Sequence, residues 1–338
     1  MRILGIMASQ NYSRLPNTLF YGGLSTTISA YQFSATTGFG TRYSDPATLP
    51  GGYTRGIDFN STAGAVAFAS TGSPYIQVYP YTAGSGWGTK FADPATLPTG
   101  TGHATAWKYQ GDAVAIAHNT SPFVSVYPWS AGFGTKYANP ATLQTAVGYG
   151  VAFTRSGNAI AASQSTSPRI NAWAWSAGFG TKYANPATLP VGYGKKVQWN
   201  PADDAIAVGH QSTPYISVYA WSSGFGTKYA NPSTLPANQG NEPSWSPSGA
   251  DLAIAHNSSP RISVYPWSAG FGTKYANPAT LPPNDCNGVG WSSTGNALAL
   301  ASKSSPFVLA YPWSAGFGTK YANPATLPAS YGYGVRLN

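Results

Sequence analysis

Cysteine and charge are both scarce in this chain of 338 residues. Its one cysteine, Cys286, cannot form a disulfide within the chain, which excludes a disulfide framework and leaves the cellular compartment open. No apolar run approaches the roughly 18 residues of a membrane-spanning helix. The segment Met1–Met7 is too short for the core of a signal peptide and lacks a small-residue cleavage site. We therefore expect a soluble protein without a membrane span or a secretion signal.

Aromatic and turn-forming residues are abundant where charged residues are few. Charged residues make up only 8% of the chain, whereas aromatics make up 14% and Gly and Pro number 39 and 28. Such a composition is typical of an all-β protein with frequent turns and a packed core, not of a disordered chain. The formal net charge of +9 favours anionic partners, such as an acidic protein surface, nucleic acid, lipopolysaccharide or another acidic glycan.

One segment, Gly-Phe-Gly-Thr-Lys-Tyr-Ala-Asn-Pro-Ala-Thr-Leu-Pro, recurs seven times with small changes. Successive copies are 48 residues apart once and then 46 residues apart five times. A period in the forties indicates either a four-stranded propeller blade or a paired-helix repeat. The first residues of the copies are Gly38, Gly86, Gly132, Gly178, Gly224, Gly270 and Gly316.

The alternation of large and small side chains with a period of two favours strands over helices. In the unit that begins at Gly150, four short runs (150–153, 159–163, 169–175 and 179–184) are separated by Gly, Pro, Asn and Ser. In the second run of another copy, Val114 and Ile116 alternate with alanines, so that one face is bulky and the other lets a neighbouring sheet approach closely. The sequence therefore predicts an all-β, seven-bladed β-propeller with four antiparallel strands in each blade.

Two columns of large side chains should fill the interfaces between blades. The first strand of each unit carries an apolar residue, and the third strand carries an aromatic one. The first set is Phe59, Trp107, Phe153, Trp199, Trp245, Trp291 and Leu337, and the second is Tyr31, Tyr79, Tyr127, Trp173, Tyr219, Tyr265 and Tyr311.

The two ends of the repeat indicate how the ring closes. The first unit begins at its second strand, near residues 17–20, and the last strand, residues 333–338, is a first strand with nothing after it. The C-terminal strand should complete the N-terminal blade, so that no blade keeps an open face. We expect one propeller domain over residues 17–338. Residues 1–16 form an extension that either packs under the first blade or serves as a docking tail.

The four-stranded unit resembles WD-repeat and related propellers over nearly the whole chain. The Trp-Asp dipeptide is absent, and Gly-His occurs only at residues 102–103 and 209–210, so the hydrogen-bond network of those families is not implied. The phrases Ser-Pro-Phe-Val-Ser-Val-Tyr-Pro-Trp (121–129) and Asn-Pro-Ala-Thr-Leu-Pro resemble repeats of propellers in bacteriophage virion proteins. That resemblance implies a structural, decoration or receptor-binding role.

No catalytic, metal or cofactor constellation is recognisable. The nine carboxylates cannot be paired for glycosidase chemistry, and Asp203-Asp204 fits a hairpin turn. His118, His210 and His256 share one repeat position at the end of the second strand, but different blades hold them too far apart for one metal ion. We predict a protein that is not an enzyme and that uses no metal or cofactor.

A basic residue recurs on the fourth strand, the outer edge of each blade. Cations on an exposed edge prevent edge-to-edge pairing, and this is our first interpretation. The alternative is a sevenfold belt that docks on an acidic partner; nucleic acid is disfavoured because the charges circle the rim instead of following a groove. This basic rim is Arg42, Lys90, Lys136, Lys182, Lys228, Lys274 and Lys320.

The link before each first strand varies more than the rest of the repeat. In a propeller this link should cross one face and reach the central channel, where mixed polar and aromatic residues could form a binding mouth. The alternative is relaxed constraint on a solvated loop. The candidate binding face comprises Tyr53, Arg55, His103, Tyr149, Tyr193, Lys195, Asn241, Asn287 and Tyr333.

Together these observations favour a non-enzymatic virion component of a bacteriophage, which decorates the particle or binds the host surface. Its partners would be other virion proteins or a glycan or protein of the host surface. The second hypothesis is a carbohydrate-binding propeller, which the Tyr and Trp content supports. It requires aromatics exposed in repeated pockets.

Overall fold

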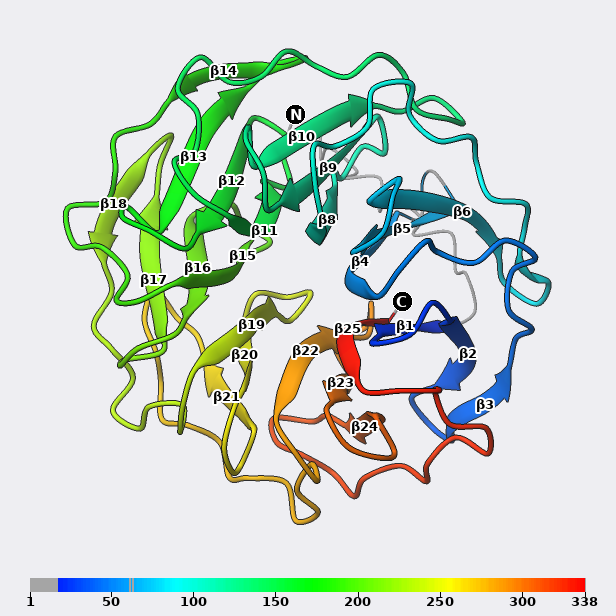
Figure 1. Ribbon diagram of the computed structural model, residues 1–338. Helices are drawn as coiled ribbons and strands as arrows, with labels where there is room; N and C mark the ends of the chain where they lie inside the picture. Colours follow the sequence, from blue (N-terminus) through cyan, green and yellow to red (C-terminus); the bar gives the residue numbers. More distant parts are fainter. Residues whose placement is uncertain (1–17, 61, 63, 338) are drawn as a thin grey trace, which may run out of the picture.

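Seven small antiparallel sheets surround a central channel (Figure 1). The computed structural model describes residues 18–60, 62 and 64–337, and every regular element in them is a β-strand. The prediction of a seven-bladed β-propeller is confirmed. The extension predicted at residues 1–16 lies outside the described residues.

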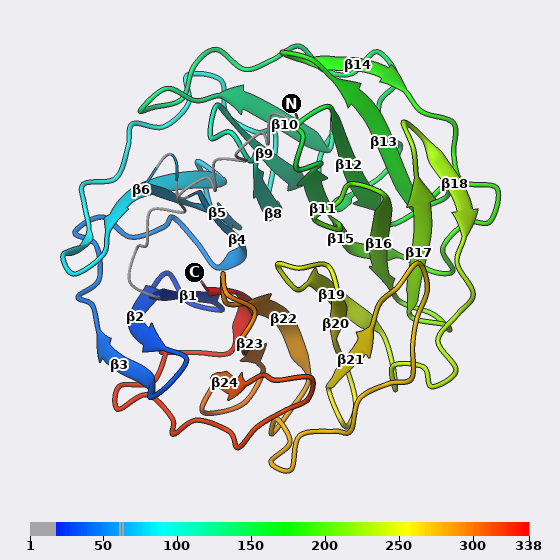
Figure 2. The ribbon, with the colours of Figure 1, turned by 180° about the vertical axis from the view of Figure 1, so that it is seen from behind.

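The C-terminal strand completes the first blade, as the ends of the repeat predict. Strand β25 pairs antiparallel with β1, and Leu19 stands opposite Leu337 and Tyr21 opposite Val335. The two views of the ring place the red C-terminal strand beside the blue N-terminal strand (Figures 1 and 2). The order across this blade is β25 (Gly332–Leu337), β1 (Thr18–Gly23), β2 (Ile28–Ser34) and β3 (Gly38–Arg42).

Three further blades have four strands in sequence order from the channel outward. Blade 2 contains β4 (Thr54–Asn60), β5 (Ala65–Ser70), β6 (Ile76–Thr82) and β7 (Gly86–Trp87). Blade 4 contains β11 (Gly148–Phe153), β12 (Ala159–Gln164), β13 (Ile170–Trp175) and β14 (Phe179–Lys182). Blade 5 contains β15 (Gly194–Trp199), β16 (Ala205–His210), β17 (Ile216–Trp221) and β18 (Phe225–Lys228).

In the other three blades the outer strand shrinks to an isolated bridge, between Trp129 and Phe133, Trp267 and Phe271, and Trp313 and Phe317. Blade 3 contains β8 (Gly102–Trp107), β9 (Ala113–His118) and β10 (Val124–Pro128). Blade 6 contains β19 (Gly240–Trp245), β20 (Asp251–His256) and β21 (Ile262–Pro266). Blade 7 contains β22 (Cys286–Trp291), β23 (Ala297–Ser302) and β24 (Val308–Pro312).

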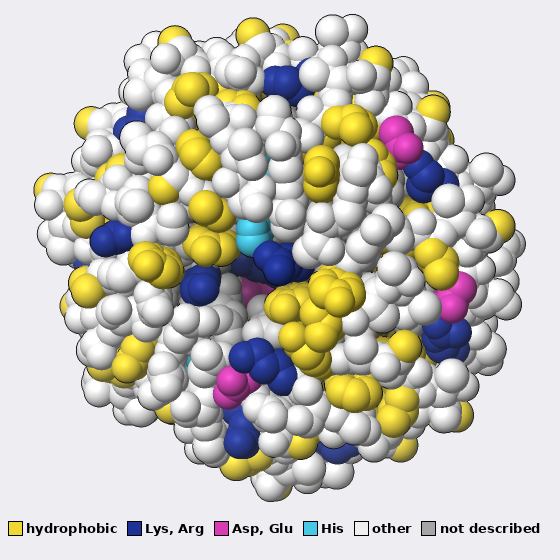
Figure 3. Space-filling view, viewed as in Figure 1, with side chains coloured by type: hydrophobic (Ala, Val, Ile, Leu, Met, Phe, Trp, Pro, Cys, Tyr) yellow, Lys and Arg dark blue, Asp and Glu magenta, His cyan; other side chains and the backbone are white. Residues whose placement is uncertain are grey.

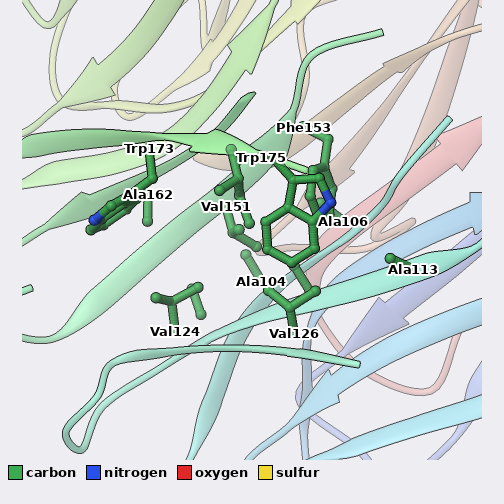
Figure 4. Close-up of a cluster of buried hydrophobic side chains, with 13 residues drawn as sticks. Ala104, Ala106, Ala113, Val124, Val126, Val151, Phe153, Ala162, Trp173 and Trp175 are labelled. Carbon is green, nitrogen blue, oxygen red and sulfur yellow. The ribbon is translucent and has the colours of Figure 1, made fainter. Parts of the chain in front are cut away.

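The core consists of the interfaces between blades. Figure 4 shows one of them, a cluster that contains small side chains of blade 3, such as Ala104 and Ala106, together with Trp173 and Trp175 of blade 4. Burial of the large columns predicted on the first and third strands is confirmed, except that Phe59 is only half-buried. Truncating one of the buried aromatics to alanine should cost about 3–5 kcal/mol.

The repeated link is tied to the next blade by the third-strand aromatics. The Tyr127 hydroxyl donates to the Thr96 carbonyl at 2.8 Å, and the Trp173 indole donates to the Thr142 carbonyl at 3.0 Å. Tyr31, Tyr265 and Tyr311 repeat this contact. The same residue column therefore packs the blade interface and fixes the link that leads to the channel.

Candidate functional site

The variable residues predicted on the link lie instead within the innermost strand of each blade. Arg55, for example, belongs to β4 and Lys195 to β15. The inner strands begin earlier than predicted because a register shift near their start, such as that between Gly102 and Ala104, lets the pairing continue. Tyr53 and Tyr193 precede their strands, and their side chains are 46% and 44% exposed.

Five of these residues form a continuous arc at one mouth of the channel. The Arg55 guanidinium lies 5.8 Å from the Tyr333 ring, and its Nη1 donates to His103 Nδ1 at 3.2 Å. The rings of His103 and Tyr149 are 5.0 Å apart, and Lys195 Nζ lies 4.9 Å from the Tyr149 ring. Each member comes from a successive blade, so the ring geometry brings together residues 46 or more positions apart.

The arc carries two positive charges that no carboxylate neutralises within the described residues. Lys195 Nζ has no hydrogen-bond acceptor or ion-pair partner there, and Arg55 Nε is buried without a hydrogen-bond acceptor. Burial lowers the pKa of His103 to about 3, with help from the nearby Arg55 and Lys195 charges, so this imidazole is neutral. Figure 3 shows basic and histidine side chains around the central hollow.

The two asparagines of the candidate face have structural partners. Asn241 Nδ2 donates to the Cys286 carbonyl and Asn287 Nδ2 to the Gly332 carbonyl, both at 2.8 Å. Each amide thus ties an inner strand to the backbone of the next blade, and this half of the mouth is neutral.

A network of four charged side chains lies deeper in the channel. Arg336 Nη1 donates to Glu242 Oε1 at 2.8 Å, and Arg336 Nε donates to Asp58 Oδ1 at 3.3 Å. Lys196 Nζ donates to Glu242 Oε2 at 2.9 Å, and Asp58 Oδ2 accepts the Trp107 backbone N–H at 2.7 Å. Two cations and two anions from four blades therefore neutralise one another across the channel.

The network sets the protonation of its members. Burial would raise the pKa of Glu242, but the Lys196 and Arg336 charges outweigh burial and hold that pKa below its ordinary value. Burial raises the pKa of Asp58 despite Arg336, and burial lowers the pKa of Lys196 despite Glu242. Glu242 is thus the firmly ionised centre of the network.

A cavity of about 480 Å³ lies beyond the network, toward the far ends of the inner strands. Its lining includes all four charged residues and Gln198. Sequence reasoning missed these residues, although a signal was present. Most copies carry Gly, Ala or Ser at the positions one and three residues before the large apolar residue of the first strand. The exceptions one residue before it are Asp58, Gln198 and Arg336, and the exceptions three residues before it are Lys196 and Glu242.

The basic rim contacts its own blades. In five copies the lysine Nζ hydrogen-bonds an Asn side chain three residues later, as Lys136 does with Asn139. Arg42 and Lys90 instead form ion pairs with Asp45 and Asp93. These contacts hold the loop after the outer strand, and a belt that docks on an acidic partner stays a prediction.

The three recurrent histidines are completely buried and hydrogen-bond a serine on the third strand. His118 Nε2 lies 3.0 Å from Ser125 Oγ, and His210 and His256 repeat the contact with Ser217 and Ser263. In the described residues, no group of three or more His, Cys, Asp or Glu could hold a metal ion. No helix there could cross a membrane.

Fold and channel define the class: the chain is a seven-bladed β-propeller. No protein-family model matches the chain, and no curated protein matches it. Among solved structures it is similar to a candidate 6-phosphogluconolactonase from Bacteroides uniformis (14% identity, TM-score 0.69, covering 96% of this chain and 100% of that one). A second, from Bacteroides fragilis, has 13% identity and a TM-score of 0.71, covering 97% and 99%.

A structure from Desulfotomaculum acetoxidans, described as functionally unknown, has 10% identity and a TM-score of 0.67, covering 95% of this chain and 98% of that one. At such low identities the similarity establishes the fold alone.

Proposed function

We propose that this propeller is a non-enzymatic binding protein of a bacteriophage particle, which holds an acidic group of the host surface or of another virion protein at the channel mouth. The observation that carries the proposal is the arc from Tyr333 to Lys195, which presents two unneutralised cations among aromatic rings. Two such cations favour an anionic partner. The proposed location in a virion rests on the resemblance of the repeated sequence phrases to those of bacteriophage propellers.

The state of the channel carboxylates supports a role in binding and not in catalysis. A general acid or base needs a carboxyl group whose pKa suits proton transfer and which is free to reach the substrate. Glu242 is held ionised by Lys196 and Arg336. Burial raises the pKa of Asp58, but Arg336 and the Trp107 backbone N–H engage both of its oxygens, so it is not free to reach a substrate. The solved structures named for 6-phosphogluconolactonase make one assay specific: we expect no hydrolysis of 6-phosphogluconolactone above the spontaneous rate.

The second hypothesis requires repeated pockets with exposed aromatics, and the third-strand aromatics do not supply them. The recurrent aromatics of the third strand are buried between blades, and the large apolar residue exposed in most copies is a leucine, such as Leu49 or Leu97. A lectin-like role would therefore use the channel or the outer pocket that Tyr137 and Phe179 line between blades 3 and 4.

The double substitution Arg55→Gln and Lys195→Gln tests the mouth. We expect wild-type protein to bind glycans that carry carboxylate or phosphate groups on a glycan array, or isolated host envelope, with an affinity that falls as salt rises. The double variant should lose about tenfold or more in affinity. A matched control, Lys228→Gln with Lys274→Gln on the basic rim, makes the same change of net charge and should bind as wild type.

Equal loss of binding in the rim control would contradict the assignment to the mouth. Mass spectrometry and cryo-electron microscopy of purified native particles test the setting. Absence of the chain from the particle would remove the virion role while leaving anion binding intact.

A further inference from the structure

The cavity beyond the charge network has two unlike walls. On one side stand Ala104, Ala106 and Ala152, whose short side chains leave room beside the inner strands although each residue is at most 8% exposed. On the other side stand Lys196, Gln198 and Arg336. Its volume of about 480 Å³ lies within the range of about 300–1,000 Å³ that is typical of small-molecule sites.

The polar wall has spare hydrogen-bond donors, and its carboxylate oxygens are already engaged. Each carboxylate oxygen of Asp58 and Glu242 already accepts a hydrogen bond. Within the described residues, Arg336 Nη2 and Gln198 Nε2 have no acceptor, and Lys196 Nζ, which has three protons, uses one on Glu242. A ligand for this wall should offer acceptor oxygens to these donors, and it can also donate to the remaining lone pairs of the carboxylates.

Charge balance decides what kind of oxygen the ligand offers. The two cations of the network are neutralised by its two carboxylates inside the channel. The fifth charged residue of the lining, Arg155, is exposed and donates from Nη2 to the Tyr109 hydroxyl at 3.2 Å. An anionic ligand would add a third negative charge to the network, whereas hydroxyl oxygens accept the free N–H groups without that cost. A ring with hydroxyls along its edge and an apolar face also matches the two walls.

We propose that this cavity binds a single neutral sugar unit, with its hydroxyls on Lys196, Gln198 and Arg336 and its apolar face against Ala104, Ala106 and Ala152. The site is separate from the acidic-group site at the mouth, because the residues of the mouth arc do not line the cavity. It does not depend on the proposed function.

Saturation-transfer NMR tests the site with glucose, galactose, mannose, rhamnose and N-acetylglucosamine, and with glucose 6-phosphate as the charged comparator. We expect millimolar or tighter binding of at least one neutral sugar, and weaker binding of glucose 6-phosphate. Binding should also change the tryptophan fluorescence, since Trp107, Trp199 and Trp245 border the cavity.

Two variants locate the binding. Ala152→Leu fills the apolar side, and Gln198→Glu removes the Nε2 donor while keeping an oxygen for the Trp245 backbone N–H, which Gln198 Oε1 accepts at 2.9 Å. Each should weaken sugar binding by about tenfold. Ala141→Leu, on the exposed part of a link, and the double mouth variant should leave it unchanged. Failure of every neutral sugar to bind, preference for glucose 6-phosphate, or loss of binding in the mouth variant would each overturn the proposal.

Discussion

At the scale of the residue, buried histidines make this protein sensitive to acid. Burial lowers the pKa of His118 to about 4 and that of His210 to about 4, and it also lowers the pKa of His256. Because the folded state resists protonation of these rings, the unfolded chain binds more protons below pH 6.5. Their contribution to stability is present above pH 6.5 and is lost as the pH falls toward 4.

Replacing His118 with glutamine should remove part of this dependence. Glutamine already occupies the same repeat position in blade 4, where Gln164 accepts a hydrogen bond from Asn171 at 3.1 Å. We expect His118→Gln to reduce the fall in unfolding free energy between pH 6.5 and 4 by about 3 kcal/mol at most, since one pKa unit corresponds to about 1.36 kcal/mol. Chemical denaturation across this range measures it; a variant with the same slope as wild type would contradict the assignment.

The sequence predicted individual site residues only in part. The residues of the mouth arc belong to the predicted binding face because their column differs between nearly identical copies, and variation within a repeat marks a position that packing does not fix. Their role in binding stays a prediction. The charge network was missed because most copies carry small residues in the columns of Asp58 and Glu242, and nothing in one strand says that Arg336, on the last strand, lies opposite them.

At the scale of the element, the inner strands pack backbone to backbone around the channel. A Cβ at Gly150 would lie 2.7 Å from Lys196 Cα and 2.8 Å from the Lys195 carbonyl, and a Cβ at Gly56 would lie 2.4 Å from Ala104 Cα. Where this column carries glycine, as at Gly56 and Gly150, the backbones of neighbouring blades approach closely.

We expect Gly150→Ala to lower the free energy of unfolding by about 1–3 kcal/mol, since neither the strand nor its neighbour can shift without moving a blade. The matched control is Gly40→Ala on the exposed outer strand β3, where the nearest atoms belong to the Gln32 side chain, which can move. Thermal unfolding followed by circular dichroism compares the two. Equal melting temperatures for both variants and wild type would show that the inner strands can accommodate the added methyl group, which would contradict the prediction.

Strands were the best-predicted elements, because short alternating runs between turn residues recur in every copy. Their outer members were predicted less well. In three blades the fourth strand is reduced to an isolated bridge. The sequences of these copies are nearly identical to those of the other blades, so they do not show which blades form the further hydrogen bonds of a full strand. The inner strands were predicted too short because the register shift at their start has no clear sequence signal.

At the scale of the whole molecule, Arg336 links the closing strand to blades 2 and 6 at once. It pairs with Asp58 and Glu242 across the channel, and the Glu242 side chain is only 4% exposed. The closure therefore has two components: the hydrogen bonds between β25 and β1, and an ionic crossing that ties β25 to distant parts of the ring.

Replacing Arg336 with methionine tests the ionic crossing. We expect a loss of about 2–4 kcal/mol in stability, because removing one partner leaves partly buried carboxylates uncompensated. Hydrogen exchange of the β1 and β25 amides should become faster than elsewhere in the ring. Lys303→Met is the control: its ion pair with Asp285 lies near the surface, with side chains 36% and 28% exposed, and its loss should cost below about 1 kcal/mol.

Uniform acceleration of exchange in all seven blades would argue against a specific role of Arg336 in closure. The closure itself was predictable, because a repeat that begins at its second strand and ends with a first strand can complete its first blade only by pairing the last strand with the first one. The crossing was not, because it depends on which blades face each other over the channel.

The antiparallel pairing of β1 with β25 also fixes how the ring yields to force. Leu19 lies opposite Leu337 and Gly23 opposite Gly332, so the start of one strand adjoins the end of the other. Tension applied to the start of β1 and the end of β25 would therefore break the hydrogen bonds between the two strands one after another, and not all at once. The ring would therefore open first between its first blade and its last strand, because in every other sheet the paired strands are consecutive along the chain.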